Sequence, residues 1–183
     1  MSIEPPLPHE IVAFWREAGH AKWFGKSDAF DETLREEFEG LHFAASRGEL
    51  SDWGETAEGA LALLILLDQV PRNIFRGSAH SYATDPLAKT IAEAAIAAGH
   101  DRALEPALAP FFYLPFEHSE SLEDQDRSVD LCKALGDVET LKWAELHHDI
   151  IRRFGRFPHR NAALGRETTE AEAAFLAEGG FAG

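Results

Sequence analysis

Five of the twelve arginines fall within residues 152–166, although the net charge of the chain is −15. Cationic side chains at a helix C-terminus interact favourably with the helix dipole, which accounts for one or two of these arginines but not for five. The guanidinium group also forms forked hydrogen bonds to carboxylates and phosphates. The cluster therefore indicates one of two arrangements: an internal network with acidic side chains such as Asp68, Glu117 or Glu120, or a pocket for a small anion.

A second ionisable group follows the aromatic run 111–116. Residues 117–120 read Glu-His-Ser-Glu and stand directly beside these apolar side chains, a setting that shifts the pKa values of acid–base groups. His118, or His159 in the arginine-rich segment, is therefore a candidate for proton transfer. The alternative is a plain connection in which a serine caps the next helix. The chain has no G-x-S-x-G elbow, so a serine hydrolase is not predicted.

Polar residues also end the most apolar stretch of the chain. Asp68 and Gln69 directly follow the apolar run 60–67, at the edge of the expected core. Pro71 lacks an amide hydrogen and disfavours helix in the residue before it, so a turn is expected there. Arg72 and Asn73 then either pair with Asp68 and satisfy helix-end groups, or face a pocket.

Two further polar side chains are expected to point inward. His147 shares one face of its predicted helix with Trp143 and Ile150, and Gln125 falls on the apolar face of its own helix. A buried amide without a hydrogen-bond partner costs about 1–3 kcal/mol. Both side chains therefore need polar partners inside the protein.

Metal and cofactor motifs give no positive prediction. Glu39 and His42, and again Glu145 and His148, have the Glu-x-x-His spacing of carboxylate-bridged di-iron bundles. A pattern this short is expected by chance in a chain rich in glutamate, so no metal site is predicted. Phosphate loops, dinucleotide fingerprints and paired cysteines are absent, and the cofactor is left unknown. The single cysteine, Cys132, is expected to pack inside a helix.

Composition excludes several classes of function. A length of 183 residues with 45% hydrophobic side chains suits one globular domain over residues 1–183, with a core of about 9–179. The strong negative charge repels phosphate backbones and anionic lipid, so neither nucleic acid nor membrane is an expected partner. The longest apolar run, residues 60–67, is far shorter than the roughly 20 residues of a membrane span. With no signal peptide predicted and a single cysteine, a cytoplasmic location is expected.

Helix caps and glycine stops predict an all-α fold. The expected helices cover about residues 8–18, 28–47, 56–70, 85–98, 121–135, 139–154 and 169–179. FFYLPF (111–116) is the one candidate strand, and its proline argues against a central position. The long connections 71–84, 100–120 and 155–167 carry the unusual residues, which favours a functional role for them. VPRNIFRG (70–77) and FPHRNAALGR (157–166) also echo each other weakly.

Five segments, taken together, resemble a bacterial family known as domain of unknown function 924. They are LDQVPRNIFRG (67–77), YATDPLA (82–88), FYLPFEHSE (112–120), EDQDRS (123–128) and IIRRFGRFPHRNAALGR (150–166). The resemblance covers nearly the whole chain from about residue 9. It implies an all-α fold similar to tetratricopeptide arrays, and it implies no activity, substrate or cofactor.

The sequence thus predicts seven to eight antiparallel helices in helix-turn-helix pairs, tetratricopeptide-like in arrangement. The leading functional hypothesis is a polar pocket, lined by arginine and histidine, that binds a small anionic or polar ligand, with catalysis left open. The alternative is a tetratricopeptide-like module that binds a protein or peptide, with a purely structural polar network. His118 and His159 are the candidate catalytic residues. The candidate ligand-binding residues are Asp68, Arg72, Asn73, Glu120, Gln125, His147, Arg153, Arg156, Arg160 and Asn161.

Overall fold

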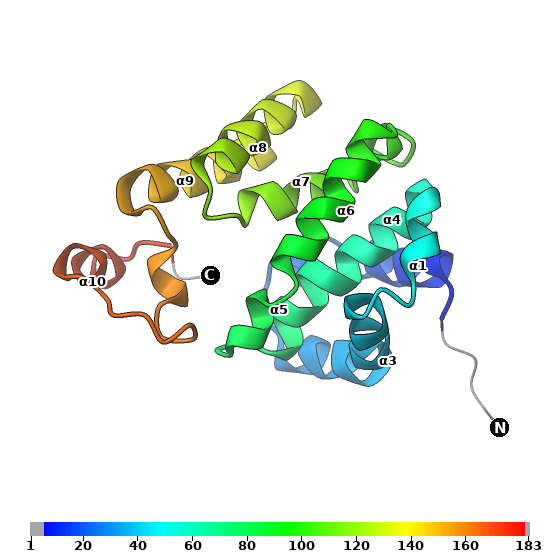
Figure 1. Cartoon of the computed structure of the whole chain (residues 1–183), viewed down its shortest axis with the longest axis horizontal. Helices are drawn as coiled ribbons and strands as arrows, with labels where there is room; N and C mark the ends of the chain where they lie inside the picture. The colour runs from blue at the N-terminus through cyan, green and yellow to red at the C-terminus, as the bar shows by residue number, and fades with distance from the viewer. Residues whose placement is uncertain (1–5, 182–183) are drawn as a thin grey trace. The chain divides into compact units, whose positions relative to one another are not determined.

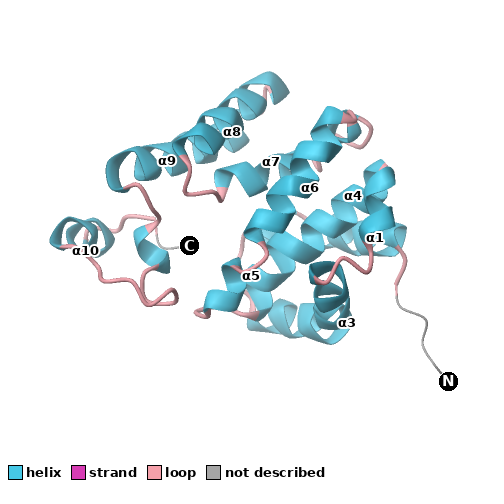
Figure 2. Cartoon of the chain, viewed as in Figure 1, coloured by secondary structure: helices cyan, strands magenta, loops and turns pink. Residues whose placement is uncertain are grey.

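The computed structural model describes residues 6–181, and within them every regular element is a helix (Figures 1 and 2). The α-helices are α1 (Pro8–Ala18), α2 (His20–Trp23), α3 (Asp28–Ser46), α4 (Ala57–Leu64), α5 (Val70–Ile74), α6 (Asp85–Ala97), α7 (Pro110–Glu117), α8 (Leu122–Leu135), α9 (Val138–Phe154) and α10 (Glu170–Ala177). The all-α prediction is confirmed. Its arrangement as tetratricopeptide-like pairs stays a prediction.

The chain divides into two compact units. Unit 1 comprises residues up to 76 together with 80–115, and it contains α1 to α6 and most of α7. Unit 2 comprises residues 77–79 and those from 116 onward, with α8, α9 and α10. The prediction of one domain over residues 1–183 stays a prediction.

Helix α4 lies at the centre of unit 1. Its side chains from Ala60 to Leu64 are buried, and α1 and α6 pack against it. A helix that is apolar on every side is stable only where neighbours remove all of its faces from water. Thr56 begins the helix by accepting a hydrogen bond from the amide of Gly59 at 3.1 Å.

The chain does not turn at Pro71, where the sequence predicted a turn. A π-helical segment, Ile65–Gln69, joins α4 to α5, and the amide of Val70 donates to the carbonyl of Ile65, five residues back. Pro71 then lies in the first turn of α5, where the amide hydrogen that it lacks has no partner within the helix in any case. Helical structure therefore runs on to Ile74.

The aromatic run 111–116 is helical, so its reading as a candidate strand is wrong. It forms most of α7, with Pro115 inside the helix. Phe111, Phe112 and Phe116 are almost completely buried. Burial of three aromatic rings outweighs the hydrogen bond that Pro115 cannot donate.

Unit 2 is built on α8 and α9, which lie side by side (Figure 1). They run antiparallel because Gly136, with φ of 79°, ends α8 and the chain turns back. Its small apolar core contains Ile150, Ile151 and Phe157.

Within residues 6–181, no helix combines the length and apolar character needed to cross a membrane.

Candidate functional site

The predicted residues Asp68, Arg72 and Asn73 lie in unit 1, around the π-helical segment. The Arg72 guanidinium pairs with Asp85 through two bonds of 2.8 and 2.9 Å and lies 3.1 Å from Asp68. Burial alone would lower the pKa of Arg72, but the charges of Asp68 and Asp85 raise it above its ordinary value. This part of the arginine set is an internal ion-pair network.

Asn73 joins a second network in the same unit. Its side-chain amide donates to the carbonyl of Gln69 at 3.0 Å, and its oxygen accepts from Arg76 at 2.7 Å. Arg76 also forms a forked pair with Asp31 of α3, at 2.6 and 3.2 Å. These contacts fasten the end of α5 to α3.

Two of the predicted arginines in unit 2 also pair with carboxylates. Arg156 makes a forked pair with the buried Glu172 at 2.6 and 2.8 Å, which lowers the pKa of that carboxyl to about 2. Arg153 is more exposed, lies 3.5 Å from Asp149 and covers the ring of Phe154. Both arginines lie beside carboxylates of the protein itself, which is the arrangement of an internal network.

Glu120 and Asn161 share a third network. Both Glu120 oxygens accept from Arg166, at 2.7 and 3.0 Å, and the amide of Phe157 donates to the same carboxylate at 2.8 Å. The oxygen of Asn161 accepts from Arg166 at 3.0 Å, while its amide donates to Glu172 at 3.2 Å. Although partial burial opposes it, hydrogen bonding to Arg166 lowers the pKa of Glu120.

Gln125 points inward, as predicted, and is fully buried on α8. Its amide nitrogen donates to the carbonyls of Glu117 and Ser119, both at 2.7 Å, at the end of α7. Its oxygen accepts no hydrogen bond from the described residues. An unsatisfied buried acceptor is costly in a folded protein, which marks this region as more than a packing contact.

His147 and Glu117 form a buried pair beside Gln125. The side chains are only 7% and 5% exposed, and His147 Nδ1 lies 3.1 Å from a Glu117 oxygen. The same nitrogen lies 2.8 Å from the carbonyl of Trp143, one turn back on α9. Two acceptors at one nitrogen place the proton on Nδ1, so the lone pair of the neutral ring is on Nε2.

Both predicted catalytic histidines lie close to this pair. The ring centroid of His118 is 6.4 Å from that of His147. The ring centroid of His159 is 5.7 Å from that of Phe157. Phe157 itself lies 5.5 Å from His147. We call His118, His147, His159, Glu117 and Arg160 the histidine cluster.

Arg160 is the predicted arginine that belongs to this cluster. Its side chain is buried, and the guanidinium carbon lies 4.4 Å from the centroid of the Phe157 ring. Its charge also contributes to the lowered pKa of Glu120. Arg160 therefore places one buried cation beside the imidazole rings of this cluster.

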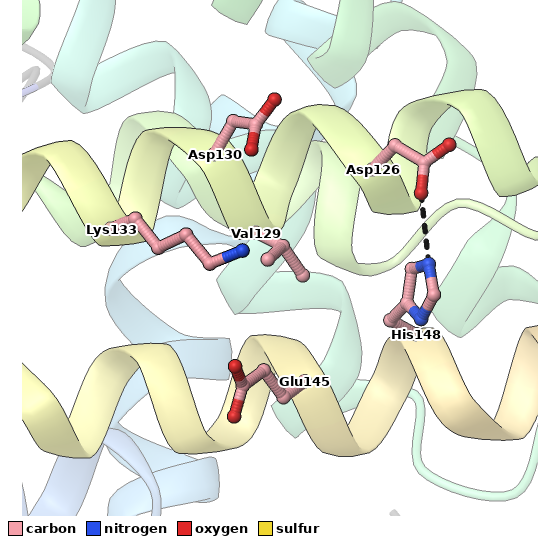
Figure 3. A pocket seen from close by; sticks show the side chains of 6 residues that line it. All are labelled: Asp126, Val129, Asp130, Lys133, Glu145 and His148. Atoms are coloured by element: carbon pink, nitrogen blue, oxygen red, sulfur yellow. Dashed lines mark hydrogen bonds and ion pairs between the residues drawn. The ribbon is translucent and has the colours of Figure 1, made fainter.

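A groove of about 520 Å³ between α8 and α9 lies outside the predicted site. It is lined by Asp126, Val129, Asp130, Lys133, Glu145 and His148, as Figure 3 shows. Nε2 of His148 lies 2.9 Å from a carboxylate oxygen of Asp126. In the part of the chain that the structure describes, no group of three or more histidine, cysteine or acidic residues could hold a metal ion.

Two features were missed from the sequence. His42 is fully buried in unit 1, with Nδ1 2.8 Å from the carbonyl of Leu66 and Nε2 3.1 Å from His80. Phe181, after α10, packs against His147 with ring centroids 4.6 Å apart. A Gly179-Gly180 pair before one aromatic residue was the available signal for the second feature, whereas nothing in the spacing linked His42 to His80.

The fold and the buried networks define an all-helical protein with a histidine cluster in unit 2. Residues 11–180 match the family model "Bacterial protein of unknown function (DUF924)", and the chain belongs to that family. The solved structure of the protein of unknown function ATU0120 from Agrobacterium tumefaciens is similar, with 54% identity, a TM-score of 0.90, and coverage of 93% of this chain and 97% of that one. None of the curated proteins matches.

Proposed function

We propose that unit 2 binds a small anionic ligand at the histidine cluster, with Glu117 and His147 able to hold or move a proton there. The observation that carries the proposal is the buried Glu117–His147 pair, at 3.1 Å. A buried carboxylate beside an imidazole contributes little net stability, because the cost of removing the carboxylate from water offsets most of the attraction. Its presence beside two further histidines therefore supports a chemical role.

The anion would lie against Arg160 and the imidazoles. Arg160 and the imidazoles of His147 and His159 all lie against the Phe157 ring. Because this ring brings one cation and two imidazoles together, we narrow the predicted set of anion-binding residues to Arg160 with His118, His147 and His159.

The proton chemistry follows from the tautomer of His147. With the Nδ1 hydrogen directed at Glu117 and Trp143, Nε2 can accept a proton from a bound acid. The adjacent carboxylate stabilises the imidazolium that results. Proton transfer to or from a ligand is open to this pair. Burial raises the pKa of the Cys132 thiol to about 12, so we give this thiol no part as a nucleophile. A cytoplasmic location is kept as part of the proposal.

Titration of the histidine imidazoles by NMR tests the proposal. Acetate and inorganic phosphate are added to the full chain, and the ring nitrogens of His118, His147 and His159 are followed. We expect saturable shifts at these three rings for at least one anion. Shifts that never saturate, or that move all nine histidines alike, would overturn the proposal.

Two variants make this test specific. Arg160→Met should abolish the saturable shifts, and His159→Gln serves the same purpose if the first variant does not fold. Arg152→Met is the matched control, because Arg152 is exposed and paired with Asp149 on α9. Binding that survives both Arg160→Met and His159→Gln unchanged would exclude the histidine cluster as the site.

A second candidate is a module that binds a peptide, and one observation favours it. Val138, Trp143 and Leu146 on α9 are exposed, although they are large apolar residues. Exposed apolar side chains on one helix are typical of docking surfaces. This candidate predicts that a peptide selected on the protein shifts the amides of α9, and that Leu146→Lys abolishes its binding while leaving anion binding intact.

A further inference from the structure

We propose that Phe181 occupies the place of a ligand's aromatic ring, so that the histidine cluster binds an aromatic carboxylate in competition with the chain's own Phe181. This inference rests on the proposed function, since it names the class of ligand for the same site. It begins from the aromatic and imidazole rings that surround Phe181.

Phe181 packs on imidazole rings. Its centroid lies 4.6 Å from that of His147 at 64° and 5.2 Å from that of His159 at 84°. Trp143 lies farther off, at 6.4 Å. Edge-to-face contacts of this kind place the positive edge of one ring against the negative face of another. Three aromatic neighbours therefore form a subsite that a planar ring fits.

The segment that carries Phe181 has a defined route. Gly179 has φ of 83°, a left-handed conformation that favours glycine, and its amide donates to the carbonyl of Leu176. The Gly180 amide donates to the carbonyl of Phe175 at 2.9 Å. A Cβ on Gly180 would lie 2.6 Å from the Phe175 ring. A side chain at position 180 would therefore push the Phe175 ring aside, and glycine lets the chain pass over this ring to bring Phe181 to the cluster.

The subsite adjoins the proton-transfer pair. His147 contacts Phe181 with its ring and Glu117 with its Nδ1. Phe157, which contacts His147 and His159, also carries Arg160 on its face. A ligand whose ring replaced that of Phe181 would therefore place its polar group near the cationic part of the cluster. A ring joined to a carboxylate satisfies both parts.

Attachment through two glycines allows displacement. Glycine leaves the backbone the widest choice of conformations, so the segment after α10 can leave the cluster without disturbing the helix. Phe181 also packs on the small core of Ile150, Ile151 and Phe157. Its removal therefore affects packing as well as access, and the experiment has to separate these two effects.

The experiment compares the full chain with Phe181→Ala, using phenylacetate as the aromatic anion and acetate as its counterpart without a ring. Affinities are measured from the imidazole shifts of His147 and His159. If Phe181 fills the subsite about nine-tenths of the time, its removal should raise the affinity for phenylacetate about tenfold. The affinity for acetate should stay the same.

Two further variants guard the result. Phe181→Leu keeps an apolar side chain on the core but lacks the ring, and it should also raise phenylacetate affinity, which covers the case in which Phe181→Ala does not fold. Phe24→Ala, which removes an exposed phenylalanine of unit 1, should leave both affinities unchanged.

Each outcome has a distinct meaning. A phenylacetate affinity that is equal or lower in both Phe181 variants overturns the inference. If acetate or phosphate still binds the unaltered chain, the proposed function survives that result. If no anion binds the unaltered chain or the variants, both the inference and the proposed function fail.

Discussion

Each of the two units contains the same hydrogen-bonded triad, in which an arginine donates to an asparagine oxygen and to a carboxylate. In unit 1, an asparagine oxygen and a carboxylate hold one arginine, in the set Asn73, Arg76 and Asp31. In unit 2 the corresponding set is Asn161, Arg166 and Glu120. The two asparagines lie in the segments 70–77 and 157–166, whose sequences echo each other.

The carboxylates differ in what they support. Asp31 belongs to α3, a helix whose apolar face is already buried. Glu120 belongs to the connection before α8 and also accepts from the amide of the buried Phe157. In unit 1 the triad reinforces a packed core. In unit 2 it positions loops around the histidine cluster. Polar networks therefore carry more of the structure where the candidate site lies.

Removing the two carboxylates tests this difference and should give the largest effects. We expect Glu120→Ala to lower the free energy of unfolding by about 3 kcal/mol and Asp31→Ala by about 2 kcal/mol. Glu120→Ala removes the acceptor of the buried Phe157 amide and two hydrogen bonds of Arg166, which keeps its bonds to Asn161 and to the Phe157 carbonyl. The Arg76 side chain, in contrast, is 37% exposed and can turn to water. Urea unfolding measures both values.

An exposed pair supplies the control for this comparison. Glu49→Ala removes the partner of Arg47 at the surface and should leave the unfolding midpoint unchanged within error. An Asp31→Ala variant as unstable as Glu120→Ala would show that the two triads contribute equally to the free energy of unfolding, which would contradict the difference proposed between the units.

Helix ends were predictable because their chemistry is local. Pro8 at the start of α1 and Gly136 after α8 act through their own backbone conformations, and both stand where the sequence placed them. The helical form of residues 111–116 was not predictable, because burial of aromatic rings by distant residues outweighs Pro115. The π-helical segment before Pro71 likewise depends on packing around α4.

The candidate site was predictable in its residue types and not in its partners. The position of His147 on an apolar helix face correctly indicated burial. Which carboxylate pairs with Arg156 or Arg160, however, depends on chain segments brought together only by folding. Phe181 could not be placed, because nothing local determines where a side chain after two glycines packs.

The pH dependence of stability should separate the units. Burial lowers the pKa of His42 in unit 1 below its ordinary 6.5, against the opposing effect of its bond to the Leu66 carbonyl; His80 lowers it further, while Glu39 raises it. Below about pH 6.5 the unfolded chain binds a proton that the folded chain does not, so stability falls as the pH falls. Glu172 in unit 2 has its pKa lowered from 4.5 to about 2, so its contribution persists down to about pH 4.5 and is lost toward pH 2.

Amide exchange measured at several pH values checks these two windows. Protection in unit 1 should decline first, and His42→Gln should remove that early decline. Glu172→Gln should leave unit 1 unaffected and remove the later loss in unit 2. A single common transition, unchanged by either variant, would contradict the assignment of the windows to these two groups.

The smallest expected effects come from the two threonine caps. Thr56 accepts from the amide of Gly59 at the start of α4, and Thr169 accepts from that of Glu172 at the start of α10. Either threonine changed to alanine should cost about 1 kcal/mol. Because α4 lies in the core of unit 1, Thr56→Ala should lower the global unfolding free energy. In α10 the one fully buried side chain is Glu172, so Thr169→Ala should instead raise local amide exchange about fivefold.

The Thr169 variant also connects the caps to the histidine cluster. Helix α10 leads into the segment that carries Phe181, so fraying of α10 should loosen the hold of that ring on His147 and His159. Thr169→Ala should then raise phenylacetate affinity in the same direction as Phe181→Ala, though less, while Thr56→Ala should not change it. Equal affinities in the two cap variants would show that the position of Phe181 does not depend on α10, and that the two glycines alone set its route.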